Sequence, residues 1–309
     1  MEIKEIEFEN YGKCVQITNG IISAAVTIDF GPRIISFGFY GGENLLYTDP
    51  ERKYAVAAGK DVPFGENSSA FYYYGGHRLW LNPRRPGQSI YPDNSAVVYS
   101  ILPDGVAFLA PKQKTTDLQA GFEIIMGEDA SDIMVVHTAK NCSKEEQTCG
   151  LWPITMVKPG GIVILPQNTD GSDLGHPNRS VVLWPETNIR DSRVFFGNRF
   201  ITIRHEAGNE IPFKIGTNNV LGWMVYVCHD FTIMKRYVHT PQAVYPDFGC
   251  SSEVRLRSDF VELQSLSPLF RIESNAGIKH VENLSIFHTM NSVDPEDEDG
   301  IAKYVENLK

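Results

Sequence analysis

A carboxylate and an amide lie two residues apart in the stretch 260–268, which reads Phe-Val-Glu-Leu-Gln-Ser-Leu-Ser-Pro. Side chains of a β-strand point alternately to opposite faces, so Glu262 and Gln264 would share one face and Val261 and Leu263 the other. Phe260 lies on the side of the carboxylate, which gives that face apolar as well as polar character. The pattern fits either an outer strand with a solvated polar face or a strand that lines a pocket.

The densest aromatic and basic passage of the chain runs over residues 71–86. Gly75 and Gly76 would let the backbone approach a neighbour closely or adopt a positive φ. In a regular strand after them, one face would carry Arg78, Trp80 and Asn82, and His77 would point to the other face. Aromatic rings beside a guanidinium and an amide suit sugars or small carboxylates, although a structural tryptophan and an ordinary arginine ion pair would give the same pattern.

Other candidate residues each have two interpretations. Lys214 stands in an apolar run, as either a site residue or a surface lysine with a buried stem. Tyr245 and Asp247 would share a face of a strand and offer a ring and a carboxylate to a ligand, unless the segment is a simple turn. His280 and Glu282 are two residues apart and would share one face of a late strand. We expect His280 to be a hydrogen-bonded structural histidine.

Further polar groups are expected on the surface. His176 lies in a Gly/Asn/Asp-rich loop that is either the rim of a site or plain exposed chain. The basic pairs Arg84-Arg85 and Lys235-Arg236 are interpreted as solvated charges unless the substrate is anionic. Zinc binding by Cys142 and Cys149 is a weak possibility, because six residues separate them and no second ligand pair follows.

Composition excludes several classes of function. The 309 residues carry a formal charge of −10 and 42% hydrophobic residues, without a run of about 18 apolar residues that would span a membrane. The charge and the lack of a basic cluster argue against nucleic acid as a partner. Five cysteines without a CxxC pair indicate reduced thiols, and the acidic start is unlike a secretory signal, so we expect a cytoplasmic protein without membrane contact. No metal or other cofactor is expected.

Short apolar runs closed by turn residues recur along the chain, and a hydrophobic period of 3.6 is nearly absent. This pattern predicts an all-β protein, a sandwich or barrel of antiparallel strands with little helix. The sequence offers no linker that would divide it, so we expect one domain over residues 1–309. Only residues 294–309 look helical, because acidic residues precede Ile301 to Val305 as they would at a helix N-terminus.

Four short motifs in order resemble a family within the galactose mutarotase-like superfamily. They are Gly75 to Trp80 (Gly-Gly-His-Arg-Leu-Trp), Phe213 to Gly216, Tyr245 to Asp247, and 260–268, followed by a glycine turn and His280 to Glu282. The resemblance covers most of the chain and is to an uncharacterised bacterial branch. It implies a large antiparallel β-supersandwich of the aldose 1-epimerase type, with a sugar cleft on one face.

The resemblance also implies residue roles. In that superfamily a glutamate in a setting like that of Glu262 is the general base on the anomeric hydroxyl, a histidine acid protonates the ring oxygen, and no cofactor is needed. Arg78 stands where these enzymes often keep an arginine that holds sugar oxygens. The acid histidine is missing, since Leu151-Trp152-Pro153-Ile154-Thr155 occupies its place. His77 and Lys214 are candidates for the proton donor, and Trp152 for a stacking surface.

These observations predict a carbohydrate-binding protein resembling aldose 1-epimerases, whose ligand is a small sugar or sugar acid. Glu262 is the predicted base, and the predicted substrate-binding residues are Arg78, His77, Trp80, Trp152, Lys214 and Asp247. The alternative is a binding module that has lost the acid and with it the reaction. A different chemistry in the same cleft, with Glu262 and Lys214 as a pair, is a third possibility. The sequence leaves the oligomeric state open.

Overall fold

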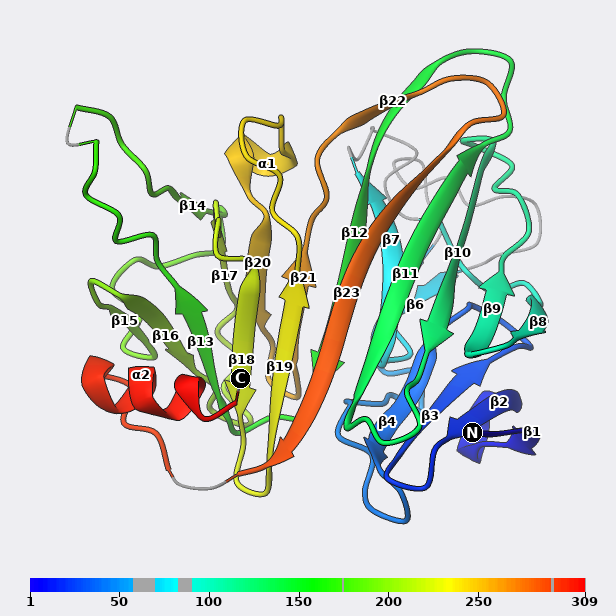
Figure 1. Ribbon diagram of the computed structural model, residues 1–309, viewed down its shortest axis with the longest axis horizontal. Helices are drawn as coiled ribbons and strands as arrows, with labels where there is room; N and C mark the ends of the chain where they lie inside the picture. The colour runs from blue at the N-terminus through cyan, green and yellow to red at the C-terminus, as the bar shows by residue number, and fades with distance from the viewer. Residues whose placement is uncertain (58–69, 83–90, 174, 290–291, 309) are drawn as a thin grey trace.

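Most of the regular secondary structure in the computed structural model belongs to two large antiparallel sheets (Figure 1). The structure describes residues 1–57, 70–82, 91–173, 175–289 and 292–308. The predicted all-β architecture with little helix is confirmed. Within the described residues no helix is long and apolar enough to cross a bilayer.

The first sheet has eleven strands and carries most of the predicted site residues. Its strand order is β1 (Glu2–Glu7), β2 (Lys13–Thr18), β3 (Ile22–Thr27), β4 (Ile34–Phe39), β7 (His77–Asn82), β12 (Gln147–Val157), β21 (Val261–Ser265), β20 (Ser252–Leu256), β17 (Phe213–Thr217) and β14 (Val181–Leu183), with β22 (Phe270–Ile272) paired to the start of β12. The centre of this sheet therefore joins segments that lie far apart in the sequence.

The second sheet has ten strands. Their order is β15 (Val194–Phe196), β16 (Phe200–Arg204), β13 (Ile162–Pro166), β18 (Trp223–Val227), β19 (Phe231–Tyr237), β23 (Gly277–His288), β11 (Asp132–Asn141), β10 (Leu118–Ile125), β9 (Gly105–Leu109) and β8 (Val98–Leu102). A separate two-stranded ribbon pairs β5 (Ala55–Ala57) with β6 (Ala70–Tyr72).

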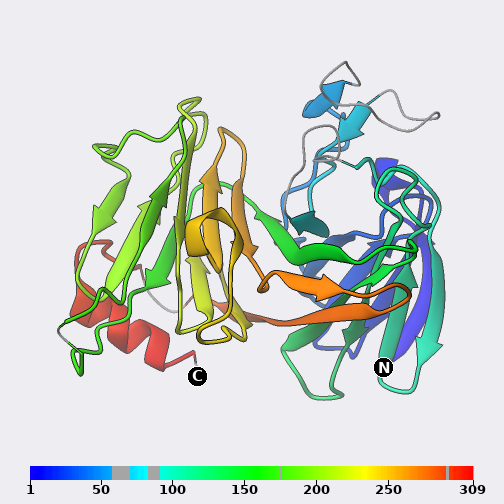
Figure 2. The same ribbon diagram turned by 90° about the horizontal axis from the view of Figure 1, so that it is seen from above.

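The main hydrophobic core lies between the two large sheets. Strands of the first sheet contribute one alternate set of side chains, such as Ile215, Val261 and Leu263, and the second sheet contributes residues such as Phe122 and Ile233. Because alternate side chains point to opposite faces, the other set on β7, β12, β21, β20 and β17 lies on the outer face of the first sheet. Figure 2 shows the layered strands from above.

Helical structure is confined to a 3₁₀ turn η1 (Glu9–Tyr11), one turn α1 (Pro246–Gly249) and the helix α2 (Glu298–Glu306). The helix expected over 294–309 is thus shorter, and it begins after Asp297, whose side chain accepts a hydrogen bond from the backbone N–H of Gly300 at 3.0 Å. Ile301 and Tyr304 pack α2 against the outer face of the second sheet, beside β13 and β18 (Figure 1).

Candidate functional site

The central strands of the first sheet align the predicted site residues in one row. On β12, Ile154 is the cross-strand partner of Arg78 on β7 and of Gln264 on β21. Gln264 in turn faces Glu253 on β20. Because partners in a sheet point to the same face, Arg78, Gln264 and Glu253 all project from the outer face.

Two glycines allow the strand with Arg78 to enter this row. Gly75 and Gly76 have φ angles of +94° and +73°. A Cβ atom would lie 2.2 Å from the carbonyl oxygen of Tyr47 at Gly75, and 2.3 Å from that of Ile34 at Gly76. Only glycine fits such close backbone contacts, so the glycine pair sets the path of β7.

Glu262 is held by a short chain of hydrogen bonds. Its side chain is buried, with 2% of its surface exposed, and it accepts a hydrogen bond of 2.7 Å from Nε2 of Gln264. The indole Nε1 of Trp152 donates to Oε1 of Gln264 at 3.0 Å. An indole N–H can only donate, so it fixes the orientation of the amide and directs the amide nitrogen to the carboxylate.

Arg78 is a buried cation enclosed by aromatic rings. Its guanidinium carbon lies 4.1 Å from the ring centre of Trp80, 4.9 Å from Phe71 and 5.3 Å from Tyr73. Among the described residues, none of its three guanidinium nitrogens has a hydrogen-bond partner. Guanidinium groups in such surroundings bind carboxylate, phosphate or hydroxyl oxygens strongly, because the donors are already desolvated.

The pKa of Arg78 reflects this environment. Burial, together with the nearby charge of Arg33, lowers it from 12.5 to about 9, while the carboxylates of Glu262 and Asp93 act in the opposite direction. Arg33 is itself satisfied by a bidentate pair with Asp93, at 2.7 and 2.8 Å. Of the two arginines, Arg33 has a carboxylate partner, and Arg78 has no hydrogen-bond partner among the described residues.

A pocket of about 390 Å³ opens beside these residues. Three aromatic side chains line it together with polar and apolar ones: Asn82, Trp152, Trp184, Lys214, Tyr245, Pro246, Asp247 and Leu269. Aromatic faces combined with a carboxylate, an amide and an ammonium are the groups that sugar hydroxyls and sugar faces require. We call this the tryptophan pocket.

The polar groups of the tryptophan pocket are connected. Nζ of Lys214 lies 2.6 Å from a carboxyl oxygen of Glu253 and 4.1 Å from the ring centre of Trp184. Nδ2 of Asn82 donates to Asp247 at 3.0 Å. Burial raises the pKa of Glu253 from 4.5 to about 8, with Lys214 opposing the rise and Asp247 adding to it.

The structure brings most of the predicted site residues to this face. Trp152, Lys214 and Asp247 line the tryptophan pocket, and the Trp80 and Trp152 rings meet edge to face with centroids 5.4 Å apart. Glu262 and Arg78 do not line the pocket; Glu262 lies beyond Trp152, to which it is connected through Gln264. The predicted roles of these residues in ligand binding and catalysis stay predictions.

His77 lies apart from the other predicted residues. It points into the space between the sheets, where Nδ1 contacts Oγ1 of Thr155 at 2.8 Å and Nε2 contacts Nε2 of His137 at 3.1 Å. Its side chain is fully buried, and burial lowers its pKa well below 6.5. The structure therefore separates His77 from Arg78, as the alternation of β7 requires.

The surroundings of His77 form a polar cluster inside the core. Oε2 of Glu282 lies 3.3 Å from Nε2 of His137 and 3.8 Å from that of His77, close enough for the three residues to hold a metal ion. Nζ of Lys235, however, lies 2.9 Å from Oε1 of Glu282. The ammonium neutralises the carboxylate, so the charges of this cluster balance without an ion.

Lys235 corrects one expectation from the sequence. Its side chain is fully buried rather than solvated, and besides Glu282 it contacts Oγ1 of Thr155 and the backbone carbonyls of Pro153 and Leu263. The expected structural role of His280 holds, because Nε2 contacts Oγ of Ser265 at 3.1 Å. Arg84 and Arg85 lie outside the described residues.

Two further expectations have clear outcomes. Of the two interpretations of the segment with Tyr245 and Asp247, the turn is confirmed: Tyr245 precedes the turn α1, and Asp247 has a φ of +49°. Both side chains line the tryptophan pocket. His176 is on an exposed loop and contacts Asp173 at 2.9 Å. Cys142 and Cys149 do not belong to a metal-binding group within the described chain.

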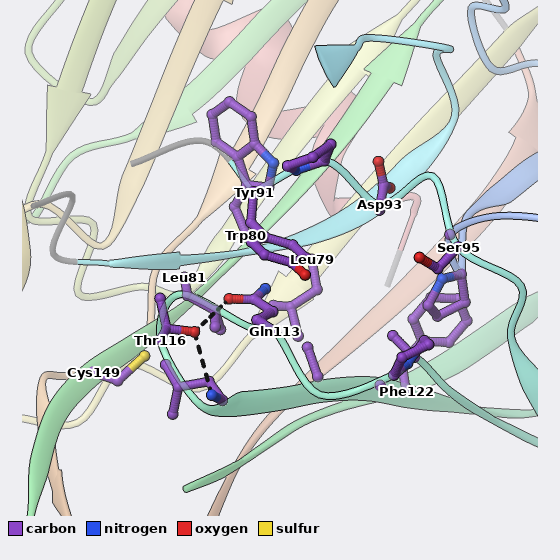
Figure 3. Close-up of a pocket in the computed structure, with 18 of the residues that line it drawn as sticks. Leu79, Trp80, Leu81, Tyr91, Asp93, Ser95, Gln113, Thr116, Phe122 and Cys149 are labelled. Carbon is purple, nitrogen blue, oxygen red and sulfur yellow. Dashed lines mark hydrogen bonds between the residues drawn. The ribbon is translucent and has the colours of Figure 1, made fainter. Parts of the chain in front are cut away.

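A second pocket, of about 100 Å³, lies between β7, β12 and β10 (Figure 3). Leu79, Leu81 and Phe122 contribute apolar walls, and Gln113 accepts a hydrogen bond of 2.7 Å from Thr116. Among the described lining residues Asp93 is the one carboxylate, and Arg33 already neutralises it. The lining residues that the structure describes do not include a paired acid and base, so we place the candidate site at the tryptophan pocket.

Glu253 is the principal site residue that was missed from the sequence. A signal was present, because Glu253-Val254-Arg255-Leu256 alternates polar and apolar residues as a strand with one exposed face does. That pattern alone favours a solvated carboxylate, whereas Glu253 is completely buried. Its position depends on the pairing of β20 with both β21 and β17, which no local pattern reveals.

Comparison with known proteins shows the fold. No protein-family model matches the sequence, and no curated protein matches it significantly. Among solved structures, a TPR-domain containing protein from Parabacteroides distasonis superposes with a TM-score of 0.61 at 13% identity, covering 92% of this chain and 48% of that one. The chain thus spans about half the length of that relative.

Two further structures match over nearly their whole length. A putative aldose 1-epimerase from Klebsiella pneumoniae has a TM-score of 0.56 at 10% identity, covering 99% of this chain and 86% of that one. A galactose mutarotase-like protein from Lactobacillus casei has a TM-score of 0.53 at 9% identity, covering 89% and 100%. The chain has the galactose mutarotase-like fold, and identities this low carry no further conclusion about activity.

Proposed function

We propose that the protein binds a monosaccharide or sugar acid on the outer face of the eleven-stranded sheet and interconverts its anomers. The ligand occupies the tryptophan pocket and extends toward Glu262 and Arg78. Glu262 is the general base, Arg78 binds ligand oxygens, and Trp152 is the aromatic surface against which the ring packs.

One observation carries this proposal: Trp152 is both a wall of the pocket and the residue that orients Gln264 toward Glu262. A ligand that packs on the indole is thereby next to an oriented carboxylate. Interconversion of anomers needs one group that removes the anomeric proton and one that protonates the ring oxygen, without any cofactor. Glu262 supplies the first of these groups.

Arg78 and Lys214 favour an anionic or hydroxyl-rich ligand. The guanidinium of Arg78 offers donors without partners among the described residues, and Lys214 is a buried ammonium at the pocket wall. A carboxylate on the sugar would pair with either cation at short range, where charge-assisted hydrogen bonds are strong. We therefore rank sugar acids, such as uronic acids, beside neutral aldoses as ligands.

The test is magnetisation exchange between anomers, measured by NMR for a panel of aldoses and uronic acids with and without protein. We expect faster exchange for at least one sugar, and a loss of about 10²-fold or more in Glu262→Gln, because a positioned general base contributes about 10²–10⁴-fold. Glu123→Gln, which changes a carboxylate on the second sheet, is the matched control. Absence of acceleration for every sugar would contradict the epimerase activity.

A second function, binding without catalysis, is favoured by the burial of the polar groups. Glu262 and Arg78 are only 2% and 1% exposed, and none of the described residues that line the tryptophan pocket is a histidine. A sugar that stabilises the folded state, with a rise in melting temperature but no exchange of anomers, would identify this function.

A further inference from the structure

Arg255 on β20 lies in one cross-strand row with the proposed base and with a residue of the pocket wall. Its partner on β21 is Glu262, and its partner on β17 is Lys214, which lines the tryptophan pocket. Cross-strand partners point to the same face of a sheet, so all three side chains project from the outer face. Arg255 therefore stands between the base and the pocket wall, one strand away from each.

The carboxylate that contacts Arg255 is that of Glu186. Oε1 of Glu186 lies 3.3 Å from Nε of Arg255, yet this buried Nε forms no hydrogen bond with any described residue. The side chain of Glu186 is 30% exposed and that of Arg255 is 19% exposed. The contact is thus an ion pair without hydrogen-bond geometry, and the glutamate side chain can turn away from it into solvent.

Glu186 reaches Arg255 from the rim of the tryptophan pocket. It belongs to the segment between β14 and β15, in which the backbone N–H of Thr187 donates to the carbonyl of Trp184 at 2.9 Å. Trp184 lines the pocket, and Oγ1 of Thr187 accepts a hydrogen bond of 3.3 Å from the backbone N–H of Lys214. The turn with Glu186 is therefore fixed to the pocket wall, and its carboxylate extends from there to Arg255.

Three cations lie near this face in the described chain, and they differ in how a ligand could reach them. Arg78 is 1% exposed and enclosed by aromatic rings. Lys214 is held at 2.6 Å by the completely buried carboxyl group of Glu253. Arg255 has the more exposed side chain, and its carboxylate partner is at the surface. A ligand carboxylate can therefore replace the partner of Arg255 more easily than that of Lys214.

The charge of Arg255 determines what can replace Glu186. Burial lowers the pKa of Arg255, but the carboxylate of Glu262, the phenol of Tyr73 and the carboxylate of Glu186 outweigh burial and raise it above its ordinary value. When Glu186 turns away, a ligand carboxylate restores the same charge. A phosphate group carries a charge of about −1.5 to −2 near pH 7 and would bring excess negative charge next to Glu262.

We propose that Arg255 determines the specificity of the site by binding the carboxylate of a sugar acid in the place where Glu186 contacts it. This inference rests on the proposed function, because it names the substrate class of the same site. In a uronic acid, the carbon that carries the carboxylate and the anomeric carbon are both bonded to the ring oxygen. Neighbouring strands lie about 4.8 Å apart, so Glu262 and Arg255 are spaced to meet the anomeric hydroxyl and the carboxylate of one ring.

A neutral aldose and a uronic acid should therefore treat the two residues differently. The aldose lacks a carboxylate and leaves the pair of Arg255 and Glu186 in place. The uronic acid exchanges that pair for a contact in which the guanidinium can donate two parallel hydrogen bonds to one carboxylate. The exchange leaves the net charge around Arg255 unchanged, and the hydrogen bonds favour the acid.

The experiment measures thermal stabilisation of the full-length protein over concentration series of glucose, galactose, glucuronate and galacturonate. The wild type should bind at least one uronate about 10-fold or more tightly than its parent aldose, because hydrogen bonds between charged groups are the strong ones. Arg255→Met should remove this preference and change the affinity for the parent aldose by less than about 2-fold. A purely structural role of Arg255 would weaken both sugars equally.

Glu186→Gln is the second variant, and it changes an exposed side chain that the fold does not require. It should bind the uronate about 2–5-fold more tightly than the wild type, with no change for the aldose, because the competing ion pair is of the weak, partly exposed kind. Arg204→Met and Glu206→Gln are matched controls, since these two residues form an ion pair of the same 3.3 Å length away from the site. Both controls should keep the wild-type preference.

Failure of the inference differs from failure of the proposed function. If sugars bind but the uronates have no advantage, or if their advantage survives in Arg255→Met, the inference is wrong and the proposed function stands. If glucose 6-phosphate binds more tightly than glucuronate and depends on Arg255, the group bound there is a phosphate and the carboxylate is wrong. If no sugar stabilises the protein, the proposed function is wrong and the inference with it.

Discussion

The Nε2 atom of Gln264 lies 2.7 Å from a carboxylate oxygen of Glu262, two residues away on the same face of β21. A carboxylate that accepts such a bond has a fixed orientation, and the indole of Trp152 fixes the amide in turn. Gln264 is therefore a positioning residue for the proposed base, and a pocket residue, Trp152, controls its orientation.

Gln264→Met should lower the rate of anomer exchange by about 10–100-fold while the apparent KM changes little. The substitution keeps the approximate volume but removes both hydrogen bonds, so Glu262 loses its orientation rather than its charge. Saturation kinetics by NMR measure the two constants separately. Gln119→Met is the control, because Gln119 also donates a hydrogen bond, to the Ala110 carbonyl, but lies on β10. An equal loss in both variants would contradict a specific role of Gln264.

Arg78→Met should stabilise the ligand-free protein and abolish ligand binding. The buried guanidinium has no hydrogen-bond partner among the described residues, and replacement of a buried charge by an apolar side chain often stabilises a protein by about 1–4 kcal/mol. The stem of the methionine can keep contact with Trp80 and Phe71. Urea unfolding measures the first effect and ligand-induced thermal stabilisation the second.

A matched control is Arg204→Met, which removes a half-exposed arginine paired with Glu206 at 3.3 Å. We expect that change to alter stability by less than about 1 kcal/mol. If Arg78→Met destabilised the protein strongly, Arg78 would have to be a structural residue whose partners lie outside the described part of the chain.

Lys235→Met should destabilise the protein by about 3–5 kcal/mol, because it leaves the carboxylate of Glu282 buried without a counter-charge. The double variant Lys235→Met with Glu282→Gln should recover about 1–3 kcal/mol of that loss, since the remaining group is neutral. Urea unfolding of the wild type, both single variants and the double variant completes the cycle. Additive single effects would contradict a direct ion pair.

The sequence was sufficient to predict the fold class and one face of the site. Alternation in the stretch 260–268 predicted that Glu262 and Gln264 share a face, and β21 confirms it. The same rule predicted that His77 would point away from Arg78. These predictions succeed because strand periodicity is a local property of the backbone, independent of which strands become neighbours.

Burial and pairing were harder to predict, because they depend on contacts distant in sequence. Lys235 was interpreted as a solvated charge, yet it is buried because β19 pairs with β23 and brings Glu282 close to its ammonium. Glu253 likewise pairs with Lys214 only because β20 lies between β17 and β21. Strand order is a global choice of the fold, and one sequence contains little information about it.

Glu253 should make the stability of the protein fall as pH rises from about 4.5 to about 8. Burial, with Asp247, raises its pKa in the folded state to about 8, so over this range the folded state holds a proton that the unfolded state has lost. Each pH unit then reduces the free energy of unfolding by about 1.4 kcal/mol from this group.

Glu253→Gln removes the titration, so the stability of the variant relative to the wild type should increase with pH at that slope. Urea unfolding at several pH values measures the difference, with Glu123→Gln as the control that should show no such slope. A constant difference between pH 5 and pH 8 would mean that Glu253 is ionised in the folded protein, and the raised pKa would be wrong.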